Sequence, residues 1–144
     1  MKTIKDTPGR ENDKSPTHKI VFNQIQQRII DQDTDAVEYC QKEYPDTCDA
    51  FLNILADQYV LFCKKQKNYG PGNISVGTNL RTDADVKLSL TGLWFRINDK
   101  VQRLKQLIIL GHADEVGESE LDTFQDLSVY GIIAQLVSAK VWGK

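Results

Sequence analysis

Apolar residues recur at steps of three and four along three long stretches of this chain, and that spacing limits the folds open to it. Residues 45–67 and 88–110 each carry one apolar helical face, and residues 119–141 become apolar nearly all round after Leu127. One apolar face is typical of an amphipathic helix, and an all-round apolar surface is typical of a central one. The sequence therefore predicts an all-α helical bundle of four to five helices.

Two shorter helices are predicted ahead of these stretches. The first begins at His18, and the second begins at Thr34 or Asp35. Residues 1–17 are polar and contain Pro8 and Pro16, so they are expected to form a flexible tail. A length of 144 residues suggests one domain, which leaves residues 18–144 as a single all-α domain.

A break follows the first long helix, in the sequence KNYGPGN at residues 67–73. Little regular pattern returns before residue 87, although a short hairpin around residues 74–77 is one alternative. Tyr69 is suited to stacking on a base, and Gly70 would let the backbone approach a ligand closely. A long functional loop is therefore predicted here, with an ordinary helix stop as the competing interpretation.

Charge and composition narrow the range of partners. The net charge is −2 and the isoelectric point is near 5.7, which argues against duplex nucleic acid but leaves room for a local basic patch that holds a small anion. No apolar run approaches the roughly 20 residues of a membrane span, and the first residues show no signal segment. Three unpatterned cysteines are expected to stay reduced. These features predict a cytoplasmic protein that does not enter a membrane.

Three carboxylates, which we call the acidic row, stand four residues apart at the start of the last long helix. They are Glu118, Asp122 and Asp126. That spacing places them on one helical face, where like charges repel. A divalent cation or a set of basic partners would remove the repulsion. The alternative is a solvated acidic helix start that favours the helix dipole.

The preceding helix carries complementary charges. Arg96, Lys100 and Arg103 lie at steps of four and three, and Asp99 stands four residues before Arg103. Asp99 and Arg103 would form an ordinary pair within the helix. Alternatively, the three basic residues face the acidic row or a phosphate, for which arginine offers two parallel hydrogen bonds.

Other familiar catalytic patterns are missing from the sequence. His18 and His112 have no second histidine at ligand spacing, so a zinc site is not expected. The Walker sequence of phosphate-binding loops does not occur. Trp94 and Trp142 stand at helical positions and are expected in the core.

Three segments, KKQKNYG, RINDKVQRL and GESELDTFQDLSVYG, together resemble the first nucleotide-modification-associated domain family of small phage and bacterial proteins. The resemblance covers about residues 55–139. The matching positions are Lys67, Tyr69, Gly70, Asp99, Lys100, Arg103, Glu118, Asp122, Asp126 and Tyr130. It implies a role in phage nucleotide metabolism or base modification, in the host cytoplasm if the chain is phage-encoded.

The chain is also loosely similar to all-α nucleoside triphosphate pyrophosphohydrolases of the MazG and dimeric dUTPase kind. That similarity implies a magnesium ion and a homo-oligomer. The implied magnesium ligands are Glu118, Asp122, Asp126 and Asp99.

Three functions follow as hypotheses. The first is a Mg-dependent nucleotide pyrophosphohydrolase, and the second is a protein that binds or sequesters a nucleotide without turnover. In both, the predicted nucleotide-binding residues are Lys67, Tyr69, Gly70, Arg96, Lys100 and Arg103. In the second, the acidic row pairs with the basic residues and needs no metal. The third is a helical interaction protein with no small ligand.

Overall fold

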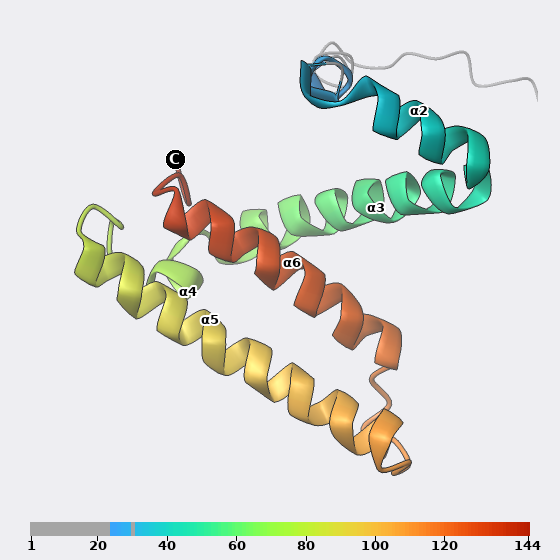
Figure 1. Ribbon diagram of the computed structural model, residues 1–144. Helices are drawn as coiled ribbons and strands as arrows, with labels where there is room; N and C mark the ends of the chain where they lie inside the picture. The colour runs from blue at the N-terminus through green and yellow to red at the C-terminus, as the bar shows by residue number, and fades with distance from the viewer. Residues whose placement is uncertain (1–23, 30) are drawn as a thin grey trace, which may run out of the picture. The chain divides into compact units, whose positions relative to one another are not determined.

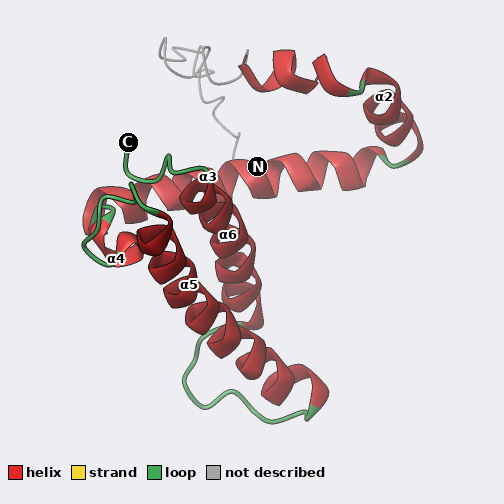
Figure 2. Cartoon of the chain, turned by 60° about the vertical axis from the view of Figure 1, so that its left-hand side comes forward, coloured by secondary structure: helices red, strands yellow, loops and turns green. Residues whose placement is uncertain are grey.

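The computed structural model describes residues 24–29 and 31–144 of the chain (Figure 1). Within that part the structure is all-α and holds no strand (Figure 2). The predicted fold class is therefore confirmed. The predicted tail, residues 1–17, and the first turns of the helix predicted from His18 lie outside the described residues.

The chain divides into two compact units, residues 1–51 and 52–144, and each is described by itself. In the first unit, α2 (Thr34–Glu43) begins where the sequence predicted a helix. The Asp33 side chain caps it by accepting a hydrogen bond of 3.0 Å from the backbone N–H of Ala36. This satisfies one of the donors that a helix start leaves without a partner.

The helix α3 (Pro45–Tyr69) begins in the first unit and ends in the second. The helix begins at Pro45, as the stretch 45–67 predicted. Proline suits the first helical position because its fixed φ is helical and its missing N–H would have had no partner there. Asp46 therefore lies inside the first turn.

The second unit adds α4 (Gly72–Ser75), α5 (Asp83–Leu104), a π-helical extension η1 (Lys105–Ile109) and α6 (Glu120–Ser138). The helices α5 and α6 run antiparallel, side by side (Figures 1 and 2). Each begins with a capping box, Thr82 with Asp85 and Ser119 with Asp122. Reciprocal hydrogen bonds in these boxes fix where both helices start.

The predicted long loop is shorter than the sequence suggested. The single helical turn α4 occupies its middle, so the hairpin around residues 74–77 is wrong. The helix α5 also begins at Asp83, earlier than the predicted residue 88. Periodicity missed this first turn because Asp83, Asp85 and Lys87 interrupt its apolar spacing, and the capping box starts the helix.

A small core joins α4, α5 and α6. The Ser89 hydroxyl, fully buried, donates a hydrogen bond of 2.7 Å to the backbone oxygen of Ile74 and fastens α4 to α5. Leu80 keeps a φ of 56°, which is unfavourable for a residue with a Cβ, but its side chain is only 1% exposed. The buried apolar residues are Ile74, Leu80, Leu93, Ile133, Val137 and Trp142.

Of the two tryptophans predicted in the core, one is there. Trp142 is buried, whereas Trp94 is 58% exposed and packs edge-to-face on Phe95, also exposed, with ring centroids 5.1 Å apart. On α5 the core-facing position is Leu93, and Trp94 is the next residue round the helix. No described helix is long and apolar enough to cross a membrane.

Candidate functional site

A cavity of about 330 Å³ lies in the second unit, where the end of α3 meets α4, α5, α6 and the C-terminal segment. Its size falls at the lower end of the range for small-molecule sites, roughly 300 to 1,000 Å³. The lining residues are Phe62, Lys65, Gln66, Tyr69, Asn73, Ile74, Arg96, Asp126, Val129, Tyr130, Ile133 and Trp142.

The KNYGPGN segment forms one side of this cavity. Gly70, with φ of 66°, donates its N–H to the Gln66 backbone oxygen at 2.9 Å and ends α3. The indole N–H of Trp142 donates to the backbone oxygen of Pro71 at 3.0 Å. A side-chain carbon at Gly143 would come within 2.7 Å of the Pro71 ring. The C-terminal segment therefore packs tightly on the break that follows α3.

Aromatic side chains supply much of the apolar lining. Phe62 and Trp142 meet edge-to-face with ring centroids 6.0 Å apart, and Tyr130 joins them from α6. Tyr69 is 67% exposed and stands at the rim. Such rings can stack on a planar heterocycle without distinguishing one base from another.

Two cations and one anion also line the cavity. Arg96 donates to the backbone oxygen of Asn73 at 3.0 Å, which ties α5 to α4. A guanidinium has five N–H donors, so this bond leaves others for a ligand. Lys65 Nζ lies 3.2 Å from Asp126 Oδ1. The charges therefore gather where α3, α5 and α6 approach one another.

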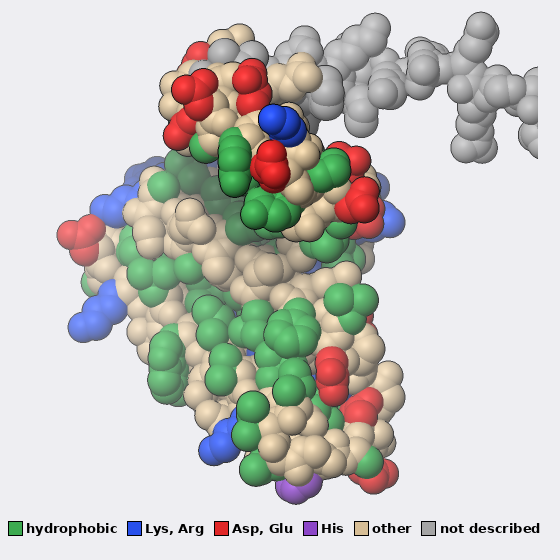
Figure 3. Space-filling model, turned by 45° about the vertical axis from the view of Figure 1, so that its right-hand side comes forward, with side chains coloured by type: hydrophobic (Ala, Val, Ile, Leu, Met, Phe, Trp, Pro, Cys, Tyr) green, Lys and Arg blue, Asp and Glu red, His purple; other side chains and the backbone are tan. Residues whose placement is uncertain are grey.

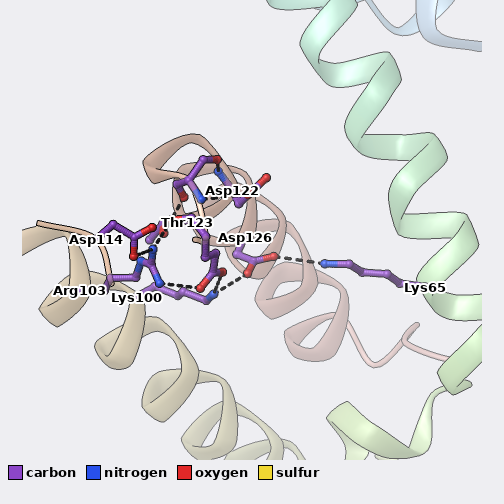
Figure 4. Close-up of polar contacts among 9 residues, drawn as sticks. Lys65, Lys100, Arg103, Asp114, Asp122, Thr123 and Asp126 are labelled. Carbon is purple, nitrogen blue, oxygen red and sulfur yellow. Dashed lines mark hydrogen bonds and ion pairs between the residues drawn. The ribbon is translucent and has the colours of Figure 1, made fainter. Parts of the chain in front are cut away.

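Beside the cavity, Lys100 bridges the acidic row (Figure 4). Its ammonium lies 2.9 Å from a Glu118 oxygen and 2.8 Å from Asp126 Oδ2. The hydrogen bonds to Asp126 and Glu118 raise the pKa of Lys100. Partial burial alone would raise the pKa of Asp126, but the hydrogen bonds from Lys100 and Lys65 hold it below its usual range. Both groups are therefore charged at neutral pH.

Arg103 belongs to the same network but not to the cavity. It donates to a Glu118 carboxylate oxygen at 2.7 Å, to Asp114 at 3.2 Å and to the Glu118 backbone oxygen (Figure 4). These bonds fasten the end of α5 to the segment that leads into α6. Three of the Arg103 N–H groups are thus bonded to protein groups, and its buried Nε has no hydrogen-bond partner among the described residues.

The predicted magnesium ligands do not gather as a metal site. Glu118 and Asp126 accept from basic side chains, and Asp122 accepts from the Ser119 backbone N–H at 3.2 Å. Asp99 is exposed on α5. Across residues 24–29 and 31–144, no three His, Cys, Asp or Glu side chains are placed to share a metal ion. As they are placed, these donors are not arranged to hold a magnesium ion.

The alternative pairing of the acidic row with basic residues is present for Lys100 and Arg103. For Arg96 that pairing is wrong, since this side chain bonds to Asn73 instead. The reason is its place on α5: Arg96 lies nearer the start of the helix, beside α4, whereas Glu118 lies at the other end of the pair.

The cavity unites only some of the predicted ligand residues. Tyr69, Arg96 and Asp126 line it, whereas Lys67, Gly70, Lys100 and Arg103 do not. The sequence interpretation missed several lining residues, which are Phe62, Lys65, Gln66, Asn73 and Trp142.

One missed set had a signal in the sequence. Phe62, Lys65, Gln66 and Tyr69 follow steps of three, one and three, which places them on one face at the end of α3.

Comparison with known protein families, curated proteins and solved structures finds no match for this chain. The resemblance to the nucleotide-modification-associated family therefore stays a prediction from the sequence.

Proposed function

We propose that this protein binds a nucleotide in the cavity between α3, α4, α5 and α6, without turning it over. The observation that carries the proposal is the lining itself. Aromatic rings from Phe62, Tyr130 and Trp142 lie in the same small cavity as the cations of Lys65 and Arg96. A nucleotide offers a partner to both kinds of side chain, because its flat base stacks on the rings and its anionic phosphate pairs with the cations.

Polar side chains support the same assignment. The side-chain amides of Gln66 and Asn73 line the cavity and make no hydrogen bond within the described part of the chain. An amide offers both donors and an acceptor, which suits the edge of a base. Arg96 keeps free N–H groups beside its bond to Asn73. The planar guanidinium of arginine can donate two parallel hydrogen bonds to a phosphate.

Binding without turnover is favoured over hydrolysis because the carboxylates are already engaged. Hydrolysis by a bound magnesium ion needs carboxylate oxygens to hold the metal near the phosphates. Here Lys100 and Arg103 occupy those oxygens on Glu118 and Asp126. A Mg-dependent pyrophosphohydrolase is the second candidate, and it rests on the acidic row and the family resemblance. A setting in phage nucleotide metabolism, in the host cytoplasm, rests on that resemblance alone.

The test is an incubation of the protein with nucleoside mono-, di- and triphosphates and cyclic dinucleotides, with and without magnesium. Chromatography follows, before and after the protein is denatured. A nucleotide that leaves solution and returns intact on denaturation supports the proposal. Conversion of a triphosphate to a monophosphate and pyrophosphate favours the hydrolase. No change in any sample favours an interaction protein without a small ligand.

A matched pair of variants locates the site. Lys65→Gln removes a cation that lines the cavity, whereas Lys67→Gln removes an exposed lysine two residues away that does not. We expect the first to weaken nucleotide binding by about tenfold, as for loss of one charge-assisted contact, and the second to leave it unchanged. Equal loss in both variants would place the ligand elsewhere.

A further inference from the structure

The charge inside the cavity is small. Of the lining residues, Lys65 and Arg96 are cations and Asp126 is an anion, so the lining carries a net charge of +1. Clefts built for triphosphates gather several cations or a metal ion because the phosphates carry several negative charges. This cavity offers less than that.

Asp126 is a fixed part of the wall. Lys65 lies 3.2 Å from one of its oxygens and Lys100 lies 2.8 Å from the other, so the carboxylate is held from α3 and from α5. Glu118 also contacts Lys100, which places a second carboxylate beyond the cavity on the same side. A phosphate chain growing toward α6 would therefore approach two carboxylates whose charges Lys65, Lys100 and Arg103 already balance, so it would gain no net positive charge there. A second phosphate placed directly against Asp126 would be repelled, because like charges at short range repel strongly where water is partly excluded.

The volume sets a second limit. About 330 Å³ lies near the floor of the range for small-molecule sites. One nucleoside fills a space of this size. A second base or a long phosphate chain would therefore extend out of the cavity past Tyr69 at its rim.

From these two limits we infer that the cavity selects a nucleoside monophosphate, and that Asp126 is the residue that discriminates against longer phosphate chains. The inference rests on the proposed function and narrows it to a ligand class. The base lies against Trp142 and Tyr130, the phosphate lies against Arg96 and Lys65, and Asp126 faces the position that a second phosphate would take.

The first test measures affinity by isothermal titration calorimetry for the mono-, di- and triphosphates of each common nucleoside, in chelator and again in magnesium. We expect the monophosphate to bind at least about tenfold more tightly than the triphosphate of the same nucleoside. Equal or tighter triphosphate binding that Lys65→Gln weakens would overturn the inference but keep the proposed function. Tighter binding of a cyclic dinucleotide would do the same. No binding of any nucleotide would overturn both.

The second test removes the discriminating charge. In Asp126→Asn the affinity ratio of monophosphate to triphosphate should fall about fivefold or more, because triphosphate binding gains most. Asp114→Asn is the matched control, since Asp114 pairs with Arg103 outside the cavity. An unchanged ratio in folded Asp126→Asn overturns the role of Asp126. Should this variant not fold, the phosphate series on the unaltered protein still decides the inference.

Discussion

Arg103 illustrates how neighbouring charges decide the role of one side chain. By its spacing on the helix it belongs with Arg96 and Lys100 as a phosphate ligand, but its N–H groups are occupied by Glu118 and Asp114. A partly buried arginine with two carboxylate partners stabilises the fold, and removing it leaves charges without a partner. We therefore assign Arg103 a structural role.

Arg103→Ala is accordingly expected to lower the free energy of unfolding by about 2 to 3 kcal/mol, the usual cost of breaking charged hydrogen bonds that are partly buried. Nucleotide affinity in the folded fraction should change by less than about twofold. Urea denaturation and calorimetry measure the two quantities. Arg103→Lys keeps the positive charge but loses the planar guanidinium, so its free energy of unfolding should lie between those of Arg103→Ala and the unaltered protein. Lost binding at unchanged stability would instead make Arg103 a ligand residue.

The Lys100–Asp126 pair predicts how stability depends on pH. The pKa of Asp126 is lowered, so its contribution is present above the ordinary aspartate pKa of about 3.9 and is lost as the pH falls through the lower folded value. The pKa of Lys100 is raised, so its contribution is full below about 10.4 and is lost as the pH rises through the higher folded value. Between these two pH limits, the contribution of the Lys100–Asp126 pair to the free energy of unfolding should be constant.

Thermal unfolding across pH 2 to 11, roughly the range of these two titrations, measures the effect. Asp126→Asn should flatten the acid side of the profile and leave the alkaline loss largely in place through the Lys100–Glu118 contact. A profile identical to that of the unaltered protein would show that the pair contributes nothing to stability.

At the scale of elements, the C-terminal segment and α4 depend on each other. Trp142 reaches from beyond α6 to the Pro71 backbone oxygen and also packs on Phe62. The contact joins the last residues of the chain to the break after α3. The cavity wall therefore depends on a hydrogen bond between segments about half the chain apart.

Trp142→Phe keeps an aromatic ring but removes the indole N–H. We expect a loss of about 1 to 2 kcal/mol in unfolding free energy, since the Pro71 oxygen loses its partner. Hydrogen exchange in residues 71–75 should become faster, and nucleotide binding should weaken. Trp94→Phe, at an exposed tryptophan, is the control and should change none of these. Unchanged exchange in Trp142→Phe would show that the hydrogen bond does not hold α4.

At the scale of the whole molecule, large hydrophobic side chains reach the surface (Figure 3). A shallow groove of about 540 Å³ follows α5, lined in part by Val86, Leu90, Trp94 and Phe95. Exposed apolar patches of this kind are typical of protein interfaces. The similarity to MazG-like pyrophosphohydrolases implied a homo-oligomer, and the α5 groove is the surface on which we now place that prediction.

Sedimentation at micromolar concentration tests this prediction. We expect an oligomer that Trp94→Lys shifts toward monomer, because a charge would have to be buried in the interface. Val116→Asp alters an exposed apolar residue outside the groove and should leave the assembly unchanged. A monomeric unaltered protein would contradict the prediction.

The sequence predicts some parts of this structure better than others. The start of α2 at Thr34 and the all-α class follow from capping residues and spacing, which are local. The α4 turn was missed because contacts such as Ser89 to Ile74, made across fifteen residues, stabilise it. Tyr69 and Arg96, both predicted as nucleotide ligands, line the same cavity, whereas Lys65 and Trp142 were found there only in the structure.

The sequence by itself determined the helices, the break at residues 67–73 and the complementary acidic and basic rows, because these depend on neighbours three or four residues apart. Only the tertiary structure decided which of these cations line a cavity. Lys65 and Arg96 line it although each also contacts a protein group, whereas Lys100 and Arg103 pair with carboxylates outside its lining. That choice is made by the packing of α3, α5 and α6, where carboxylates from one helix reach cations on the others.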